Sequence, residues 1–149
     1  MTSQIWTDAQ FDEMSWHDNH VHALRIVEVS DGAGDLILDV DHIVEWIKNG
    51  TGFNFRIVPA TLTFHDVMFL RMSLDYATPT AAFGPFMING IERRNEQRAR
   101  HLAQLWKIDI SWPQGEIAFE ACGFTQRARS GPVLSQRQRL SADERERAA

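Results

Sequence analysis

The sequence predicts a mainly β fold, either an antiparallel β-sandwich or a curved, barrel-like sheet, with a short N-terminal helix. About seven short segments alternate apolar and polar residues, a pattern typical of strands with one buried face. Turns rich in glycine, proline or asparagine separate these segments. A length of 149 residues with 44% hydrophobic content suits one domain, residues 1–149, with a core of its own.

The short helix is expected over residues 8–14. Thr7 is a suitable N-cap, and Gln10, three residues later, completes a capping box. Trp6 precedes the cap and Phe11 lies four residues after it, which is the spacing of a hydrophobic staple.

Two alternating segments, 20–29 and 35–42, predict a first β-hairpin whose turn is formed by residues 31–34. We place Ser30 opposite Asp35 and expect the second strand to continue through residues 42–47. This register assigns one face to the core, with Val27, Val29, Leu36, Leu38 and Val40. The other face carries His20, His22, Leu24, Ile26, Ile37, Asp39 and Asp41.

A second hairpin is expected from the alternating segments 55–64 and 68–76, and Pro59 within it indicates a sheet edge or a bulge. A further strand covers residues 86–91, with Asn89-Gly90 as a turn or bulge signal. The polar, arginine-rich residues 92–101 predict a solvated loop or a short exposed helix.

A third hairpin pairs residues 106–112 with 117–121, and matching apolar residues sets Ile110 against Ile117. This hairpin contributes Trp106, Ile108, Ile110, Trp112, Ile117, Phe119 and Ala121 to the core. Residues 125–149 are expected to be a polar, arginine-rich and partly disordered tail. Ser141 with Glu144 is suited to cap a short helix within this tail.

Composition narrows the classes of function. The single cysteine, Cys122, excludes an internal disulfide and a multi-cysteine zinc site, so a reducing, cytoplasmic location is expected. The N-terminus does not resemble a signal peptide, and no apolar segment is long enough to span a membrane. The net charge is -5.

Charge is unevenly distributed along the chain. Residues 1–50 contain ten acidic residues against Arg25 and Lys48, and the rest of the chain has a positive balance. The acidic half would attract a metal ion or a basic protein partner, or is simply a solvated acidic surface. Nucleic acid is an unlikely partner, because the basic segment has no interleaved aromatic residues. The oligomeric state is left open.

The best candidate site lies at the open end of the first hairpin, where histidines and aspartates are expected to converge. Its residues are His17, His20, His22, Asp39 and Asp41. Four of them, His20, His22, Asp39 and Asp41, are candidate ligands of a divalent metal that would activate water for hydrolysis. The spacing matches no dedicated metal motif, so a polar histidine–aspartate network without any cofactor is favoured.

Three blocks of sequence resemble those of a small bacterial family with no assigned activity. They are Trp16-His17-Asp18 with His20 and His22, residues 35–46, and residues 59–67. The layout is similar to that of some immunity proteins of polymorphic toxin systems, which act by binding one toxin. The resemblance implies a non-enzymatic binding or interaction module. A metal-dependent enzyme, most simply a hydrolase, is the alternative, and an apolar-ligand carrier is a third.

Overall fold

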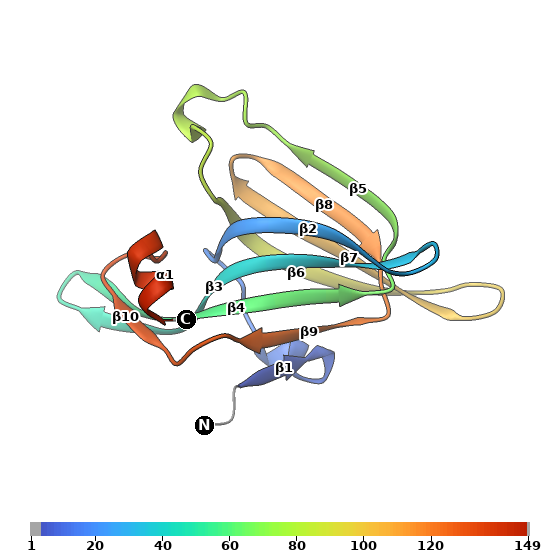
Figure 1. Cartoon of the computed structure of the whole chain (residues 1–149), viewed down its shortest axis with the longest axis horizontal. Coiled ribbons are helices and arrows are strands. Elements are labelled where there is room, and N and C mark those ends of the chain that lie inside the picture. The colour runs from blue at the N-terminus through green and yellow to red at the C-terminus, as the bar shows by residue number, and fades with distance from the viewer. Residues whose placement is uncertain (1–3, 149) are drawn as a thin grey trace.

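The computed structural model describes residues 4–148 and confirms a mainly β, antiparallel fold (Figure 1). The strands are β1 (Ile5–Thr7), β2 (His20–Ser30), β3 (Ala33–Asn49), β4 (Gly52–His65), β5 (Met68–Leu74), β6 (Phe86–Gln97), β7 (Leu102–Trp112), β8 (Gly115–Glu120), β9 (Gly123–Ala128) and β10 (Val133–Ser135). The helices are the 3-10 helices η1 (Asp8–Glu13) and η2 (Pro79–Ala81) and the α-helix α1 (Ala142–Ala148). None of the helices in residues 4–148 is long and apolar enough to cross a membrane.

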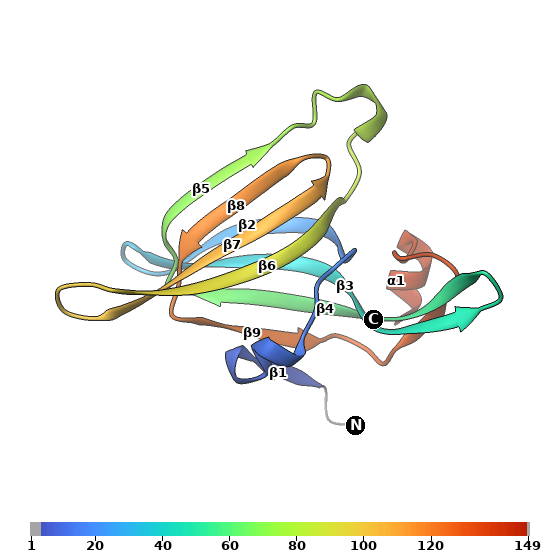
Figure 2. The ribbon, with the colours of Figure 1, turned by 180° about the vertical axis from the view of Figure 1, so that it is seen from behind.

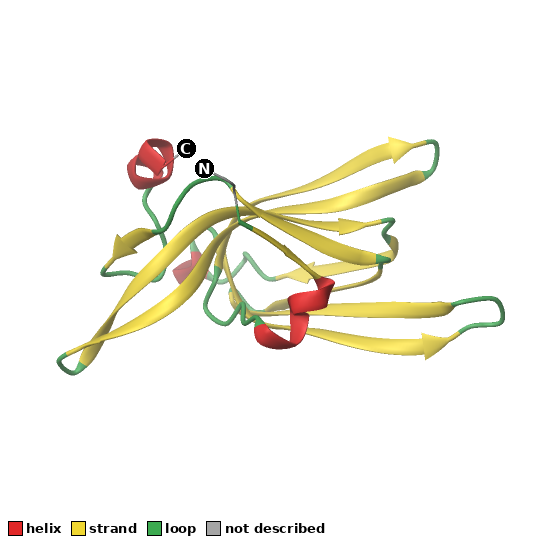
Figure 3. Ribbon diagram, turned by 90° about the horizontal axis from the view of Figure 1, so that it is seen from below, coloured by secondary structure: helices red, strands yellow, loops and turns green. Residues whose placement is uncertain are grey.

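All strands belong to one sheet that bends back on itself. The order is β1-β9-β4-β3-β2-β6-β7-β8-β5, and β10 pairs with β4 beside this path. One half consists of β1, β9, β4, β3 and β2, and the other of β6, β7, β8 and β5. Among the described strands, the pairing between the halves is limited to His20 and Val21 of β2 with Met87 and Phe86 of β6. Figure 2 shows the halves as two layers, and Figure 3 shows them diverging when seen from below.

The core lies between the inner faces of the two halves. Phe64 of β4 packs on Trp106 of β7 and Phe119 of β8, with ring centroids 5.3 and 4.7 Å apart. Phe11 of η1 contacts Trp106 from the side at 5.4 Å. The expected capping box of this helix is present, because Thr7 N–H donates to Gln10 Oε1 at 2.8 Å. A sandwich-like core covered on one side by η1 therefore holds the fold together.

The first hairpin exists, but the predicted register is wrong. The turn consists of only Asp31 and Gly32, the latter with φ of +75°, so Ser30 pairs with Ala33. A bulge then changes the pairing, which sets Ile26 against Leu36. Leu24 and Ile26 therefore share the face of the buried residues Leu36, Leu38 and Val40, as partners across an antiparallel pair do. Val27 is only half-buried and Val29 is 66% exposed, against expectation.

The second predicted hairpin is also wrong, although both of its strands exist. β4 pairs with β3 and β9, whereas β5 pairs with β8 in the other half of the sheet. Pro59 lies in an interior strand rather than at an edge. It falls between the segments of β4 that pair with β9 and with β10, and its carbonyl accepts from Arg129 N–H at 2.8 Å. The missing N–H of proline therefore interrupts no ladder at this point.

The expected loop or helix over residues 92–101 is wrong for residues 92–97, which continue β6 and pair with β7, whereas residues 98–101 form the connection between these strands. The expected bulge at Asn89 is present between Ile88 and Gly90. The third hairpin has the predicted buried face, except that Trp112 is 43% exposed. Its register differs from the prediction by two residues, since the turn is Pro113-Gln114 and Ile108 lies opposite Ile117. A shift of two leaves the faces unchanged.

The C-terminal segment up to residue 148 contains β9, β10 and α1, where the sequence predicted a polar, partly disordered tail. β9 lies between β1 and β4, and its residues Phe124, Gln126 and Ala128 are buried. The predicted cap of α1 is present as a reciprocal pair of bonds. Ser141 N–H donates to Glu144 Oε1 at 2.9 Å, and Glu144 N–H donates to Ser141 Oγ at 3.2 Å.

Candidate functional site

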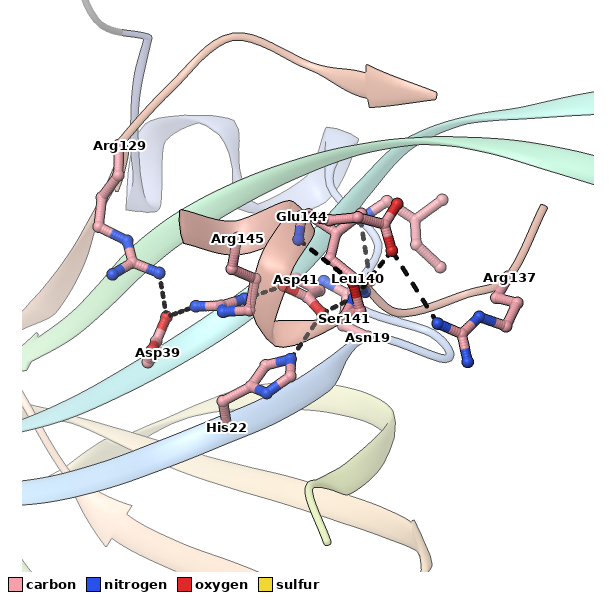
Figure 4. A network of polar contacts seen from close by, with 11 residues as sticks. Asn19, His22, Asp39, Asp41, Arg129, Arg137, Leu140, Ser141, Glu144 and Arg145 are labelled. Atoms are coloured by element: carbon pink, nitrogen blue, oxygen red, sulfur yellow. Dashed lines mark hydrogen bonds and ion pairs between the residues drawn. The ribbon is translucent and has the colours of Figure 1, made fainter. Parts of the chain in front are cut away.

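The start of β2 and the middle of β3 bring part of the predicted site together. His20 pairs with Asp41 and Ala23 pairs with Asp39, while His22 lies in the bulge between these two pairs. A bulge turns the side chain of its extra residue away from the regular alternation. His22 Nε2–H thereby donates to Asp41 Oδ2 at 2.7 Å (Figure 4).

Asp41 is the centre of the site, and its side chain is 0% exposed. Besides His22, its Oδ2 accepts from the backbone N–H of Leu140 at 2.9 Å. Its Oδ1 accepts from Arg145 Nη1 of α1. A buried carboxylate is tolerated only when hydrogen bonds and an opposite charge replace its hydration. Both oxygens of Asp41 have such partners, and all of them come from β2 or the C-terminal segment.

Asp39 joins the same network from the neighbouring position on this face of β3. Its Oδ1 accepts from Arg145 Nη2 and from Arg129 Nη2, which follows β9. Figure 4 shows the Arg145 guanidinium lying between the two carboxylates. The planar fork of arginine suits this bridging geometry, since its two terminal nitrogens donate in parallel. We call Asp39, Asp41, His22, Arg129 and Arg145 the carboxylate–arginine network.

The C-terminal segment is anchored beside the network by apolar contacts. Leu140 is buried with Ile43, Phe55 and Ile57 in a second, smaller core cluster. This anchoring fixes the backbone N–H of Leu140 toward Asp41 and places α1 over the sheet. Arg145 follows one turn after the capped start of the helix, so its side chain reaches both carboxylates.

The other two predicted histidines take different positions. His17 is exposed, and its contact is with Asp18 at 3.3 Å rather than with Asp39 or Asp41. His20 is half-buried, and its Nδ1 has no hydrogen-bond partner among the described residues. Burial, followed by the charge of Arg139, lowers the pKa of His20 below its ordinary value. His20 is therefore held largely neutral near pH 7.

A histidine outside the predicted site is more deeply buried. His42, on the opposite face of β3, packs on Trp6 and Trp16, with ring centroids 5.2 and 6.1 Å away. Burial lowers its pKa to about 4. Asn19 Nδ2–H donates to His42 Nδ1 at 2.7 Å, while Asn19 Oδ1 accepts from Ile43 N–H at 3.2 Å. The network of Asn19 and His42 is a structural polar contact within the core.

The arrangement can neutralise charge and fasten the C-terminal segment. In residues 4–148 no group of three or more His, Cys, Asp and Glu side chains is placed to hold a metal ion. The position between Asp39 and Asp41, where a cation would be bound, contains the guanidinium of Arg145. The sequence grouped His22, Asp39 and Asp41, which lie together here, but gave no sign of the donors Arg129, Arg145 and the N–H of Leu140.

The acidic N-terminal half is also paired in part with the basic remainder of the chain. Apart from the network, Glu45 bonds to Arg56 at 3.0 Å and Asp12 lies 3.9 Å from Arg93. The uneven charge of the sequence thus serves internal pairing at several positions.

A comparison with known protein families found no match, and no curated protein matches the sequence.

Proposed function

We propose that this protein is a non-enzymatic binding module that recognises another protein. The observation that carries this proposal is the occupation of Asp39 and Asp41 by Arg145 and Arg129. These carboxylates were the strongest candidates for metal binding or water activation, and here they accept hydrogen bonds from the chain itself. A carboxylate that ligates a metal or activates water needs an oxygen directed at the metal or the water, and both oxygens of Asp41 are already engaged by His22, Leu140 and Arg145.

The resemblance to immunity proteins makes the proposal more specific. Such a protein would act by forming a stoichiometric complex with one toxin and would need neither a cofactor nor a chemical step. Several large apolar side chains are exposed on the sheet, which is typical of surfaces that bind other proteins. They include Ile26, Val29, Met68, Phe69 and Met72.

The test is to express this protein together with individual polymorphic toxins and to measure growth and complex formation. We expect protection of the cells and a one-to-one complex that persists in the presence of a chelator. The His22→Ala variant should protect as well as the unaltered protein once its folding is verified. Absence of a complex with any of the purified toxins would contradict the proposal.

A metal-dependent hydrolase using His17, His20, His22, Asp39 and Asp41 is the second candidate. One observation favours it, since His22 and both aspartates do converge at one place on the sheet. Metal binding there would require the Arg145 guanidinium to leave. Protection or turnover that depends on a divalent ion and disappears in His22→Ala would therefore favour the hydrolase.

A further inference from the structure

A groove lies between β2 and β5, the strands that form the upper borders of the two layers in Figure 1. Its volume is about 350 Å³. The lining includes Ile26, Val27, Leu36, Val67, Phe69 and Leu70, so most of its side chains are apolar. Leu36 belongs to the core, whereas Ile26 and Phe69 are largely exposed. The groove thus continues the core outward to the surface.

Both strands beside the groove have an unpaired edge. β2 pairs with β6 only through His20 and Val21, so among the described strands residues 22–30 have β3 as their sole neighbour. β5 is the last strand of the sheet and, within residues 4–148, pairs with β8 alone. An open edge presents backbone N–H and C=O groups that can pair with an added strand. A strand added to β2 here would also cover the groove.

Phe69 is unusual in both its backbone and its exposure. It has φ of +56°, a region that bulky residues rarely adopt, and it lies in a bulge of the β5–β8 pairing. Its side chain is 73% exposed. The bulge directs an aromatic ring into solvent beside the groove, where it gains no burial in the isolated protein. Backbone strain of this kind is concentrated at binding and catalytic sites.

The charged residues in the groove's own lining are acidic, whereas a second pocket that shares Phe69 is lined by Arg93, Arg94 and Arg98. Glu28 and Asp35 belong to its lining, which contains no basic residue among those described. Asp31 lies in the adjoining β2–β3 turn. Asp66 follows β4 nearby, and its backbone N–H donates to Asp35 Oδ1 at 3.2 Å. A partner with lysine or arginine beside apolar residues would complement both properties of this surface.

We propose that the β2–β5 groove binds an extended, basic and apolar segment of a partner protein as an added strand on the β2 edge. Apolar side chains of the segment would enter the groove between Ile26 and Phe69. Basic side chains of the segment would lie beside Glu28 on the face of Ile26 or beside Asp35 on the opposite face, with Phe69 available for a cation–π contact. This inference rests on the proposed binding function and assigns it a surface and a class of partner.

The experiment uses a defined probe, an acetylated and amidated peptide of alternating arginine and valine, with a glutamate–valine peptide as control. Backbone amide shifts of the full-length protein are recorded by NMR during titration of each peptide. We expect the arginine–valine peptide to shift amides of residues 22–30 and 67–71, and the glutamate–valine peptide to leave them unchanged. Binding should weaken roughly tenfold or more in Phe69→Asn and in Glu28→Lys.

Each variant has a control that makes the same kind of substitution at a position outside the groove. Asparagine tolerates the positive φ at position 69, so Phe69→Asn removes the ring without adding backbone strain. Phe53→Ala removes another exposed ring, and Glu13→Lys reverses another exposed charge, and neither should alter binding. Each variant's spectrum verifies its fold before titration.

Several results would overturn the inference. These are shifts centred elsewhere, equal binding of both peptides, no shifts at about 1 mM peptide, or a self-association that occupies the β2 edge. If the protein still binds a toxin after both Phe69→Asn and Glu28→Lys, the groove is not the binding surface, while the proposed binding function stands. A metal-dependent activity at His22 would instead overturn the binding function itself.

Discussion

Replacement of Arg145 by methionine tests whether its guanidinium neutralises a buried carboxylate. The Arg145 side chain is 12% exposed and bridges Asp39 and Asp41, of which Asp41 is completely buried. Loss of one partner from a buried ion pair costs about 3 to 5 kcal/mol, because the remaining charge is uncompensated. Asp41 keeps its bonds from His22 and Leu140, and Asp39 keeps Arg129. We therefore expect about 3 kcal/mol, the lower end of this range.

Urea denaturation at neutral pH measures this loss. Arg137→Met is the matched control, since Arg137 is 62% exposed and lies 3.9 Å from Glu144. The control should cost less than about 1 kcal/mol, as exposed ion pairs do. Adding Asp41→Asn to Arg145→Met should cost less than the sum of the single changes, because the uncompensated charge is then absent. Equal losses for Arg145→Met and Arg137→Met would refute the reasoning.

Three further predictions concern the core, the start of β3 and pH, and all are measured by urea denaturation. Ile108→Ala should lower the free energy of unfolding by about 2 to 5 kcal/mol and Lys107→Ala far less, and similar small losses would contradict the placement of Ile108 opposite Ile117. Gly34→Ala should destabilise the protein far more than Gly90→Ala, because a Cβ on Gly34 would lie 2.3 Å from the Val27 carbonyl oxygen and one on Gly90 would meet open space. His42, with its pKa lowered to about 4, binds a proton more readily in the unfolded chain. The free energy of unfolding should therefore fall by about 3 kcal/mol as pH decreases from about 6.5 to 4. The same dependence of unfolding free energy on pH in His42→Gln would contradict this prediction.

The strands and their buried faces were largely predictable because alternation is a local property. The inward faces of β3, β7 and β8 followed from spacing alone, as in Leu36, Leu38 and Val40. Register was not predictable to the same degree, because it depends on the turn and on bulges. Asp31-Gly32 is itself a strong signal for a two-residue turn, and using it would have corrected the first hairpin near its turn.

Pairings between distant segments could not be read from local patterns. β4 and β5 are separated by two residues in sequence and lie in different halves of the sheet. The candidate site shows the same limit, since Arg145 and Asp41 are 104 residues apart. The arginine-rich composition and the Ser141–Glu144 cap were both visible in the sequence. Their relation to Asp39 and Asp41 depends on Leu140 docking into the second core cluster.

Metal analysis of protein purified without a polyhistidine tag tests the central claim most directly. That claim is that Arg145 and Arg129, rather than a metal ion, neutralise Asp39 and Asp41. We predict no stoichiometric ion after purification and no change in melting temperature with added zinc or manganese. A retained ion that stabilises the fold by about 2.7 kcal/mol at a hundredfold excess over its Kd, with the gain lost in His22→Ala, would contradict the account.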